Sequence, residues 1–149
     1  MTNPYVEQVR AYAEKEGNQV IPICAKLEEE IAQLNEQEAT EFLQSLGVDD
    51  TGLRRLIKTA FTTLGLITYL TTGEIETRAW TIHKGTKAPE AAGKIHTDLE
   101  KGFIRAEVVA FDDMVKYQGR VGAKEAGKAR AEGKDYIVQD GDVILFFHN

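Results

Sequence analysis

Gly65 marks the position at which the periodicity of the apolar residues changes, and this change constrains the fold more than any other feature. Before it, apolar side chains recur at helical spacing, most clearly over residues 51–64. After it, residues 66–72 are rich in β-forming side chains. Helices followed by strands predict an α+β chain rather than a strict alternation of the two. The length of 149 residues suits one average domain or two small ones.

The first part, residues 1–65, is expected to be mainly helical. Four helices are predicted, over residues 4–16, around 27–34, around 42–46 and over 51–64. Asn3 and Pro4 are a typical cap and first-turn residue for the first of these helices. Residues 20–24 are predicted to form a short buried strand, although Pro22 is atypical of a central strand. The three glutamates at 28–30 predict a solvated helical face rather than a metal site, because adjacent helical carboxylates point in different directions.

The second part, residues 66–149, is expected to form a sheet with short helices. Strands are predicted over residues 66–72, 77–82, 103–111, 136–138 and 143–147. A short helix is predicted to open at Pro89, with Gly93 near its end. A second helix is predicted over 113–118, capped by Asp112 and Asp113, followed by a partly helical connection over 119–133. Turns are predicted at Gly73-Glu74 and at Asp140-Gly141. This order of elements is typical of a β-grasp, ubiquitin-like domain.

The net charge of −6 conceals a difference between the two parts. Residues 1–66 carry 6 basic and 11 acidic side chains, whereas residues 78–134 carry 12 basic and 8 acidic ones. A globally acidic chain is a poor ligand for nucleic acid, yet a locally basic face can still contact phosphates. Charge alone does not distinguish such a face from ordinary solvated side chains.

No catalytic or metal-binding set accompanies these charges in the sequence. The histidines His83, His96 and His148 are scattered without a second ligand at a suitable spacing, so no metal site is predicted. Cys24 cannot form an internal disulfide, which fits a reducing cytoplasm, and is expected to be a small buried residue rather than a nucleophile. Residues 122–129 have the spacing of a phosphate-binding P-loop, but Ala129 stands where a Ser or Thr must ligate Mg²⁺. No signal peptide and no membrane-spanning run are predicted, so no membrane partner is expected.

Several strings of the sequence resemble the C-terminal TGS domain of the YchF, or Obg-like, ATPase family. They lie at residues 64–69, 72–74, 78–98, 122–128 and 140–143, and with the first part they extend the resemblance over essentially the whole chain. The resemblance implies a TGS domain of the β-grasp fold over residues 66–149. It also implies that residues 1–65 are a mainly helical C-terminal remnant of an α/β P-loop G domain. Members of the family are cytoplasmic, ribosome-associated P-loop proteins that hydrolyse ATP or GTP.

The resemblance further implies where the nucleotide site of such a parent protein ends. Cys24, Ala25 and Lys26 resemble the last element of that site, a loop whose backbone N–H groups face the purine. The phosphate-binding loop, the switch regions and the base-recognition motif of the family have no counterpart in this sequence. The chain is therefore expected to be a fragment that needs no cofactor and is not itself an enzyme. Its first part is expected to expose apolar faces, which favours self-association.

The best candidates for contact with RNA or the ribosome are the basic residues of the second part. They are Arg78, His83, Lys84, Lys87, Lys94, Lys101 and Arg105. Lys84 to Lys87 form a predicted turn before the helix at Pro89, where backbone donors and two ammonium groups suit a phosphate.

TGS domains are associated with RNA or ribosome contact and with regulation of their parent proteins. The resemblance therefore implies a binding and regulatory module. Two alternatives stay open: a stand-alone module that binds RNA or the ribosome, and a protein-interaction domain that uses the sheet face or an open edge strand. An autonomous enzyme is the least favoured reading.

Overall fold

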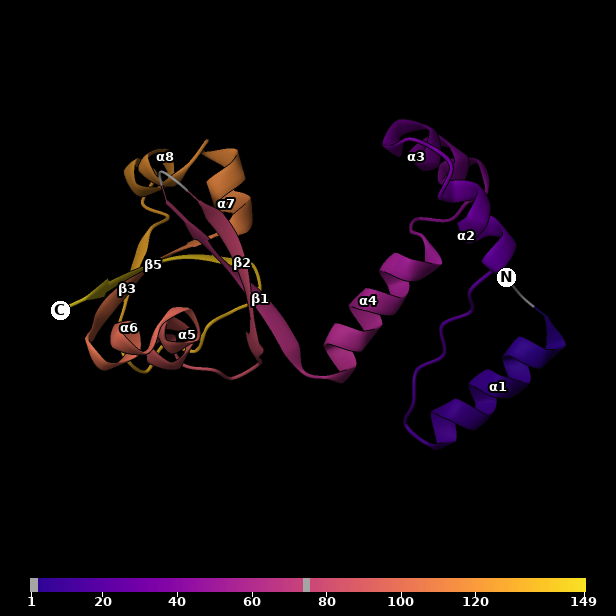
Figure 1. The fold of residues 1–149 in the computed structure, drawn as a ribbon, viewed down its shortest axis with the longest axis horizontal. Helices are drawn as coiled ribbons and strands as arrows, with labels where there is room; N and C mark the ends of the chain where they lie inside the picture. Colours follow the sequence, from indigo (N-terminus) through magenta and orange to yellow (C-terminus); the bar gives the residue numbers. More distant parts are fainter. Residues whose placement is uncertain (1–2, 74–75) are drawn as a thin grey trace. The chain divides into compact units, whose positions relative to one another are not determined.

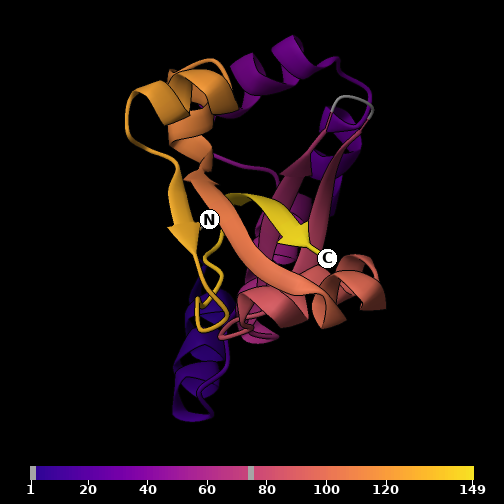
Figure 2. The ribbon, with the colours of Figure 1, turned by 90° about the vertical axis from the view of Figure 1, so that its left-hand side faces the viewer.

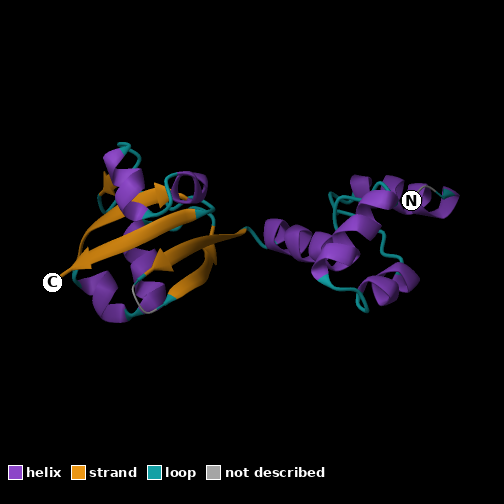
Figure 3. Cartoon of the chain, turned by 90° about the horizontal axis from the view of Figure 1, so that it is seen from above, coloured by secondary structure: helices purple, strands orange, loops and turns teal. Residues whose placement is uncertain are grey.

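The computed structural model describes residues 3–73 and 76–149 of the chain (Figure 1). The chain divides into two units, Met1–Thr63 and Leu64–Asn149. Figure 3 distinguishes the helical first unit from the second, which contains the strands. Mixed helix and sheet in one chain confirm the predicted α+β class.

The first unit consists of four helices joined by loops. They are α1 (Pro4–Lys15), α2 (Ala25–Ile31), α3 (Glu36–Ser45) and α4 (Gly52–Thr63). The predicted start of α1 is confirmed, because the Val6 N–H donates to the Asn3 side chain over 2.9 Å and Pro4 lies in the first turn. A capping box between Asn35 and Glu38 begins α3.

The predicted strand over 20–24 is wrong, since these residues form a loop that leads into α2. No strand lies within the described part of the first unit, so this segment has no neighbour with which to form a ladder. Its backbone is instead held by a side chain, because Arg55 Nη2 donates to the Pro22 carbonyl over 3.0 Å. The expected solvated glutamate face also needs correction at Glu28. Its Oε1 accepts from the Gly52 N–H over 2.7 Å and so caps α4.

The second unit is a five-stranded sheet with helices on both sides (Figures 1 and 2). Its strands are β1 (Leu66–Thr72), β2 (Thr77–His83), β3 (Phe103–Ala110), β4 (Arg130–Glu132) and β5 (Asp142–His148). Its helices are α5 (Ala88–Ile95), α6 (Thr97–Lys101), α7 (Phe111–Lys116) and α8 (Arg120–Glu125). The views show α5 and α6 together on one side of the unit, opposite α7 and α8.

The strands are arranged in the order β2-β1-β5-β3-β4. β1 and β2 form an antiparallel hairpin in which Leu66 pairs with His83 and Thr72 with Thr77. β1 also lies parallel to β5 through the pair Leu70 and Val143. β3 runs antiparallel to both β5 and β4. The first and last strands of the unit therefore lie side by side in the middle of the sheet, and β2 and β4 form its edges.

The core of this unit lies between the sheet and α5. The small buried residues of the helix, Ala88, Ala91 and Ala92, let it approach the sheet closely. Tyr69 of β1 is fully buried among them, and its hydroxyl donates to the Ala91 carbonyl over 2.8 Å. This contact satisfies the one polar group that the ring carries into the core. The position of α5 relative to the sheet is thus fixed by packing and by a hydrogen bond.

Three sequence predictions for this unit need correction. Residues 136–138 do not form a strand; an isolated bridge pairs Ile137 with Lys87, and the Val138 N–H donates to the Thr86 carbonyl. α7 begins at Phe111, so Asp112 and Asp113 lie in its first turn and do not cap it. The turn at Asp140-Gly141 is present, with Gly141 at a φ of 79°, but it precedes β5 without joining two strands.

The remaining differences are elements that the sequence did not predict. α6 and β4 were not expected. α5 ends at Ile95, two residues after Gly93, which confirms the prediction that Gly93 lies near its end. Of the turn predicted at Gly73-Glu74, Glu74 lies outside the described residues. None of the helices that the structure describes is both long and apolar enough to span a bilayer.

Candidate nucleic-acid interface

The turn between β2 and α5 carries Lys84 and is closed by local hydrogen bonds. The His83 carbonyl accepts from the Thr86 N–H over 3.1 Å and from the Thr86 hydroxyl over 2.7 Å. The Lys84 N–H donates to the Gly65 carbonyl over 2.8 Å and ties the turn to the start of β1. Gly85 has a φ of 94°, a conformation that glycine adopts at little cost. The exposed Lys84 ammonium is thus presented on a fixed backbone.

A hollow of about 540 Å³ lies beside this turn, between the outer edge of β2 and α5. It brings together two of the candidate residues, His83 and Lys94. The other residues that line it are Leu66, Thr81, Ile82, Thr86, Glu90 and Gly93. The lining therefore combines the main chain of an edge strand, a lysine, a histidine and one carboxylate.

Lys87 is held at the start of α5 by an ion pair. Its Nζ donates to Asp135 Oδ1 over 2.8 Å, and both side chains are exposed. The hydrogen bond from the lysine lowers the pKa of the Asp135 carboxyl, and the same bond raises the pKa of Lys87. Lys87 is thus charged and oriented, but part of its positive potential is offset by its partner.

The backbone at the start of α5 offers few donors to an anion. The Ala88 N–H donates to the Tyr136 carbonyl over 2.9 Å, and Pro89 has no N–H. Any attraction for phosphate at this turn therefore comes from the lysine side chains rather than from a backbone cradle.

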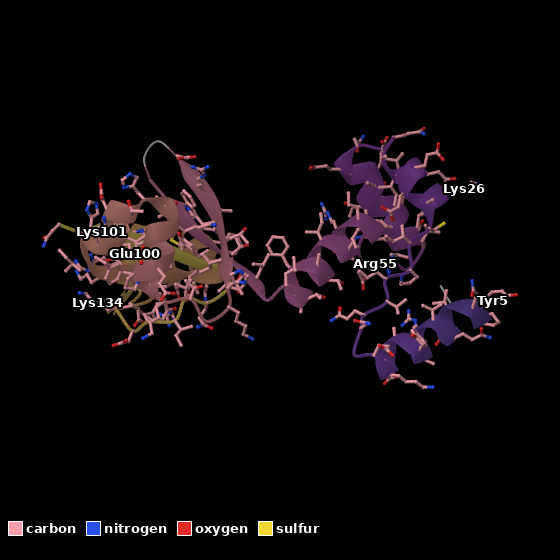
Figure 4. All side chains as sticks on the ribbon, turned by 60° about the horizontal axis from the view of Figure 1, so that its bottom comes forward. Tyr5, Lys26, Arg55, Glu100, Lys101 and Lys134 are labelled. Atoms are coloured by element: carbon pink, nitrogen blue, oxygen red, sulfur yellow. The ribbon has the colours of Figure 1, made fainter. Side chains whose placement is uncertain are left out.

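The other basic candidates lie away from this turn. Arg78, at the opposite end of β2, stacks over the ring of Trp80 at 4.5 Å from the ring centroid. Arg105, on β3, lies over Phe147 at 3.9 Å from the ring centroid, on the face of the sheet away from the core. Lys101 ends α6 (Figure 4). The structure thus groups His83, Lys84, Lys87 and Lys94, and leaves Arg78, Lys101 and Arg105 outside that group.

The predicted remnant of the purine-site loop lies in the first unit. Cys24 is half-buried and is the N-cap of α2, which Ala25 begins. Lys26 is exposed in the first turn of this helix (Figure 4). The Glu28 N–H donates to the Cys24 carbonyl over 3.0 Å, which fixes the turn through which the loop enters the helix.

A polar cluster that the sequence did not predict orders the loop behind the basic turn. Tyr136 donates its hydroxyl proton to the buried Asp142 Oδ2 over 2.7 Å, and Arg130 Nη2 donates to the same hydroxyl over 3.1 Å. The Gln139 N–H adds a bond of 2.8 Å to the same carboxylate oxygen. We call Arg130, Tyr136 and Asp142 the latch. The sequence signal that could have indicated this cluster was Asp142, a carboxylate directly before the apolar residues 143–147.

The P-loop-like string is not a phosphate-binding loop in the structure. Its first residues lie within α8, and an added Cβ at Gly122 would collide with the Tyr117 carbonyl oxygen. This glycine is therefore explained by close packing. Within residues 3–73 and 76–149, no group of three His, Cys, Asp or Glu side chains has the geometry of a metal site.

A family model and several relatives match this chain. The model for the YchF-GTPase C-terminal region, described as a protein of unknown function (DUF933), matches residues 66–149. The chain is 57% identical over 147 residues to "Ribosome-binding ATPase YchF" of Escherichia coli O157:H7, covering 99% of this chain and 40% of that protein. It is 56% identical, with the same coverage, to the protein of the same name from Bacillus subtilis (strain 168).

Solved structures match as well. The structure of the Schizosaccharomyces pombe YchF GTPase superposes with a TM-score of 0.84 at 36% identity, covering 98% of this chain and 39% of that one. A GTP-binding protein from Pyrococcus horikoshii OT3 superposes with a TM-score of 0.70 at 21% identity, covering 99% of this chain and 42% of that one, which supports the fold alone.

Proposed function

Because the chain belongs to the YchF family and corresponds to its C-terminal part, we propose that it is a ribosome-binding and regulatory module that does not hydrolyse nucleotide. The chain spans about 40% of the length of the curated relatives it matches. Those relatives are named as ribosome-binding ATPases. The module would act in the cytoplasm, where ribosomes are.

We assign residues 66–149 to a TGS domain of the β-grasp fold. The strand order β2-β1-β5-β3-β4, with one central parallel pair, supports this assignment. We assign residues 1–65 to the helical end of a G domain. Cys24, Ala25 and Lys26 would then complete a purine site whose other elements are supplied by the rest of such a protein.

The observation that carries the ribosome proposal is the grouping of basic residues around the β2–α5 turn. His83, Lys84, Lys87 and Lys94 come from a strand end, a closed turn and one helix, within one sheet-and-helix unit. Lysines held on fixed backbone attract the phosphates of ribosomal RNA without reading its sequence. Arg78, Lys101 and Arg105 lie outside this group and are assigned a lesser part in binding.

The test is co-sedimentation of the chain with purified Escherichia coli ribosomes at low salt. The double variant Lys84→Glu/Lys87→Glu should bind at least about tenfold more weakly, because two attractive charges become repulsive. The matched control is Lys116→Glu/Lys128→Glu, which makes the same change of charge near α7 and α8. Equal binding by both variants, or no binding by the unchanged chain, would refute the proposal.

The absence of hydrolysis is tested separately. None of the described residues forms a phosphate-binding loop or a set of Mg²⁺ ligands, so we expect no turnover of ATP or GTP above the buffer rate. Turnover by the purified chain that EDTA abolishes would contradict this part of the proposal.

A further inference from the structure

The outer edge of β2 carries main-chain groups that pair with no strand among the residues that the structure describes. β2 is the terminal strand of the sheet and, among the strands that the structure describes, pairs with β1 alone. Its sequence Thr-Arg-Ala-Trp-Thr-Ile-His contains neither proline nor glycine, and the ladder with β1 runs without a register shift. Natural edge strands are usually shortened, bulged, covered or rich in charge to prevent pairing with other chains. β2 has only one fully charged side chain along its length.

The register of the hairpin shows which main-chain groups face outward. The Lys84 N–H donates to Gly65 and the Gly73 N–H donates to Glu76, so even-numbered residues of this strand face β1. In an antiparallel ladder the alternate residues direct their N–H and C=O groups to the other side. In β2 these are the odd-numbered residues, which include Ala79, Thr81 and His83. These outward groups are spaced as in a regular β-strand, so an added strand can pair with them.

One flank of α5 lies beside the edge of β2. The hollow of about 540 Å³ lies along Thr81, Ile82 and His83 on one side and along α5 on the other. Gly93 lies in this flank of the helix, and the Glu100 side chain packs where a Cβ on Gly93 would stand. An edge strand beside a helix is the geometry in which extended peptides bind by strand addition, with side chains entering the space over the helix.

The charged residues around the edge of β2 indicate which kind of ligand it would bind. Three cations lie around the edge: Lys84 at one end, Arg78 at the other and Lys94 on α5. Two carboxylates, those of Glu76 and Glu90, lie there as well. A second copy of this chain fits poorly, because antiparallel pairing centred on Thr81 would place Arg78 of each copy opposite Lys84 of the other. A segment with carboxylates near its ends and apolar residues at its centre complements the same pattern.

We propose that the outer edge of β2, with the flank of α5, binds an extended acidic segment of a partner protein by strand addition. Main-chain hydrogen bonds to the N–H and C=O groups of Ala79 and Thr81 and to the N–H of His83 would supply affinity. The His83 carbonyl already accepts from Thr86. Lys84 and Lys94 would favour the acidic ends of the segment, and the hollow beside Ile82 would receive one of its apolar side chains. Lys84 and Lys94 are shared with the proposed contact to ribosomal RNA, whereas the main-chain hydrogen bonds are not, so strand addition can be tested without RNA.

The probe is a blocked peptide of the length of β2, with central valines and glutamates at both ends. It is added to the full ¹⁵N-labelled chain, and amide shifts are followed by NMR. We expect the largest shifts at Ala79, Thr81 and His83. The same peptide N-methylated at alternate residues keeps its side chains and loses its donors along one side. It should bind about tenfold more weakly when the methyl groups face β2.

Two substitutions at Thr81 separate the main chain from the side chain. Thr81→Pro removes an outward N–H and leaves the ladder with β1 intact, so peptide binding should fall about tenfold. Thr81→Val retains the N–H and β-branching, and should bind as the unchanged chain does. Lys94→Glu should also weaken binding, whereas Lys128→Glu should not.

Equal binding by Thr81→Pro and by the unchanged chain would overturn the proposal. The N-methylated peptide tests the same main-chain hydrogen bonds without altering the protein. The proposal can therefore be refuted even if Thr81→Pro does not fold. If a single-stranded oligouridylate shifts the amides of Ala79, Thr81 and His83 while the peptide shifts none, the edge binds nucleic acid and the proposal is wrong. The assay contains no ribosome, so its outcome is independent of the ribosome proposal.

Discussion

At the scale of single residues, the side chains of Lys87 and Asp142 are held by partners that are distant in the sequence. Asn3 and Gly141 lie where the sequence places a cap and a turn, because both roles depend on neighbouring backbone. The partners of Lys87 and Asp142 come from residues that are brought close only by the fold, Asp135 and Arg130 respectively. The sequence therefore located the basic turn but not the groups that orient it.

The latch predicts a pH-dependent contribution to stability. Burial, followed by the hydrogen bond to Asp142, raises the pKa of Tyr136 to about 12. The unfolded chain releases this proton at about pH 10, so the contribution is full below that pH and is lost as pH rises towards about 12.

The variant Tyr136→Phe tests this contribution by urea unfolding. Its free energy of unfolding should be about 1–2 kcal/mol below that of the unchanged chain at about pH 8. The difference should shrink at about pH 11. A difference that stays constant or grows between these two values would contradict the role given to the hydroxyl.

At the scale of elements, strongly periodic segments were predicted well and short ones were missed. The apolar patterns of α1, α4, β1 and β2 gave their positions to within one or two residues. β4 was missed because Arg130 to Glu132 carry no strand-like pattern and are extended only through pairing with β3. Residues 136–138 have the pattern of a strand, but they meet the loop before α5 rather than another strand.

The close approach of α8 to the preceding turn predicts an unusual response to alanine. In an exposed helix Gly→Ala stabilises by about 1 kcal/mol. At Gly122 the new Cβ would meet the Tyr117 carbonyl oxygen, so Gly122→Ala should lower the free energy of unfolding by about 1–3 kcal/mol. Gly133→Ala is the control, since a Cβ there meets no atom within 4 Å. Thermal unfolding of both variants gives the comparison, and a stabilised Gly122→Ala would show that the contact is absent in solution.

At the scale of the whole molecule, the α+β class followed from the change at Gly65, but the sheet order did not. The central pairing of β1 with β5 joins segments separated by the rest of the unit, and no local pattern specifies it. The division of function between the two units, a helical remnant and a binding module, stays a proposal that solution experiments can test.

The first unit predicts self-association of the chain. Tyr5 and Tyr12 of α1 are 76% and 67% exposed, and Leu53 of α4 is 59% exposed. Apolar side chains in such number on a small helical unit favour burial against another surface. We expect sedimentation velocity to show a concentration-dependent dimer, and Tyr5→Ser/Tyr12→Ser to reduce it. A chain that stays monomeric at high concentration would contradict this expectation.

The most direct measurement of the central claim is the affinity of the full chain for purified ribosomes across a salt series. If Lys84, Lys87 and Lys94 contact phosphates, the logarithm of the binding constant should fall linearly with the logarithm of salt concentration, with a slope of about −2 to −3. Lys84→Glu should make that slope shallower by about 1. Binding that does not change with salt, or no binding at the lowest salt, would contradict the account.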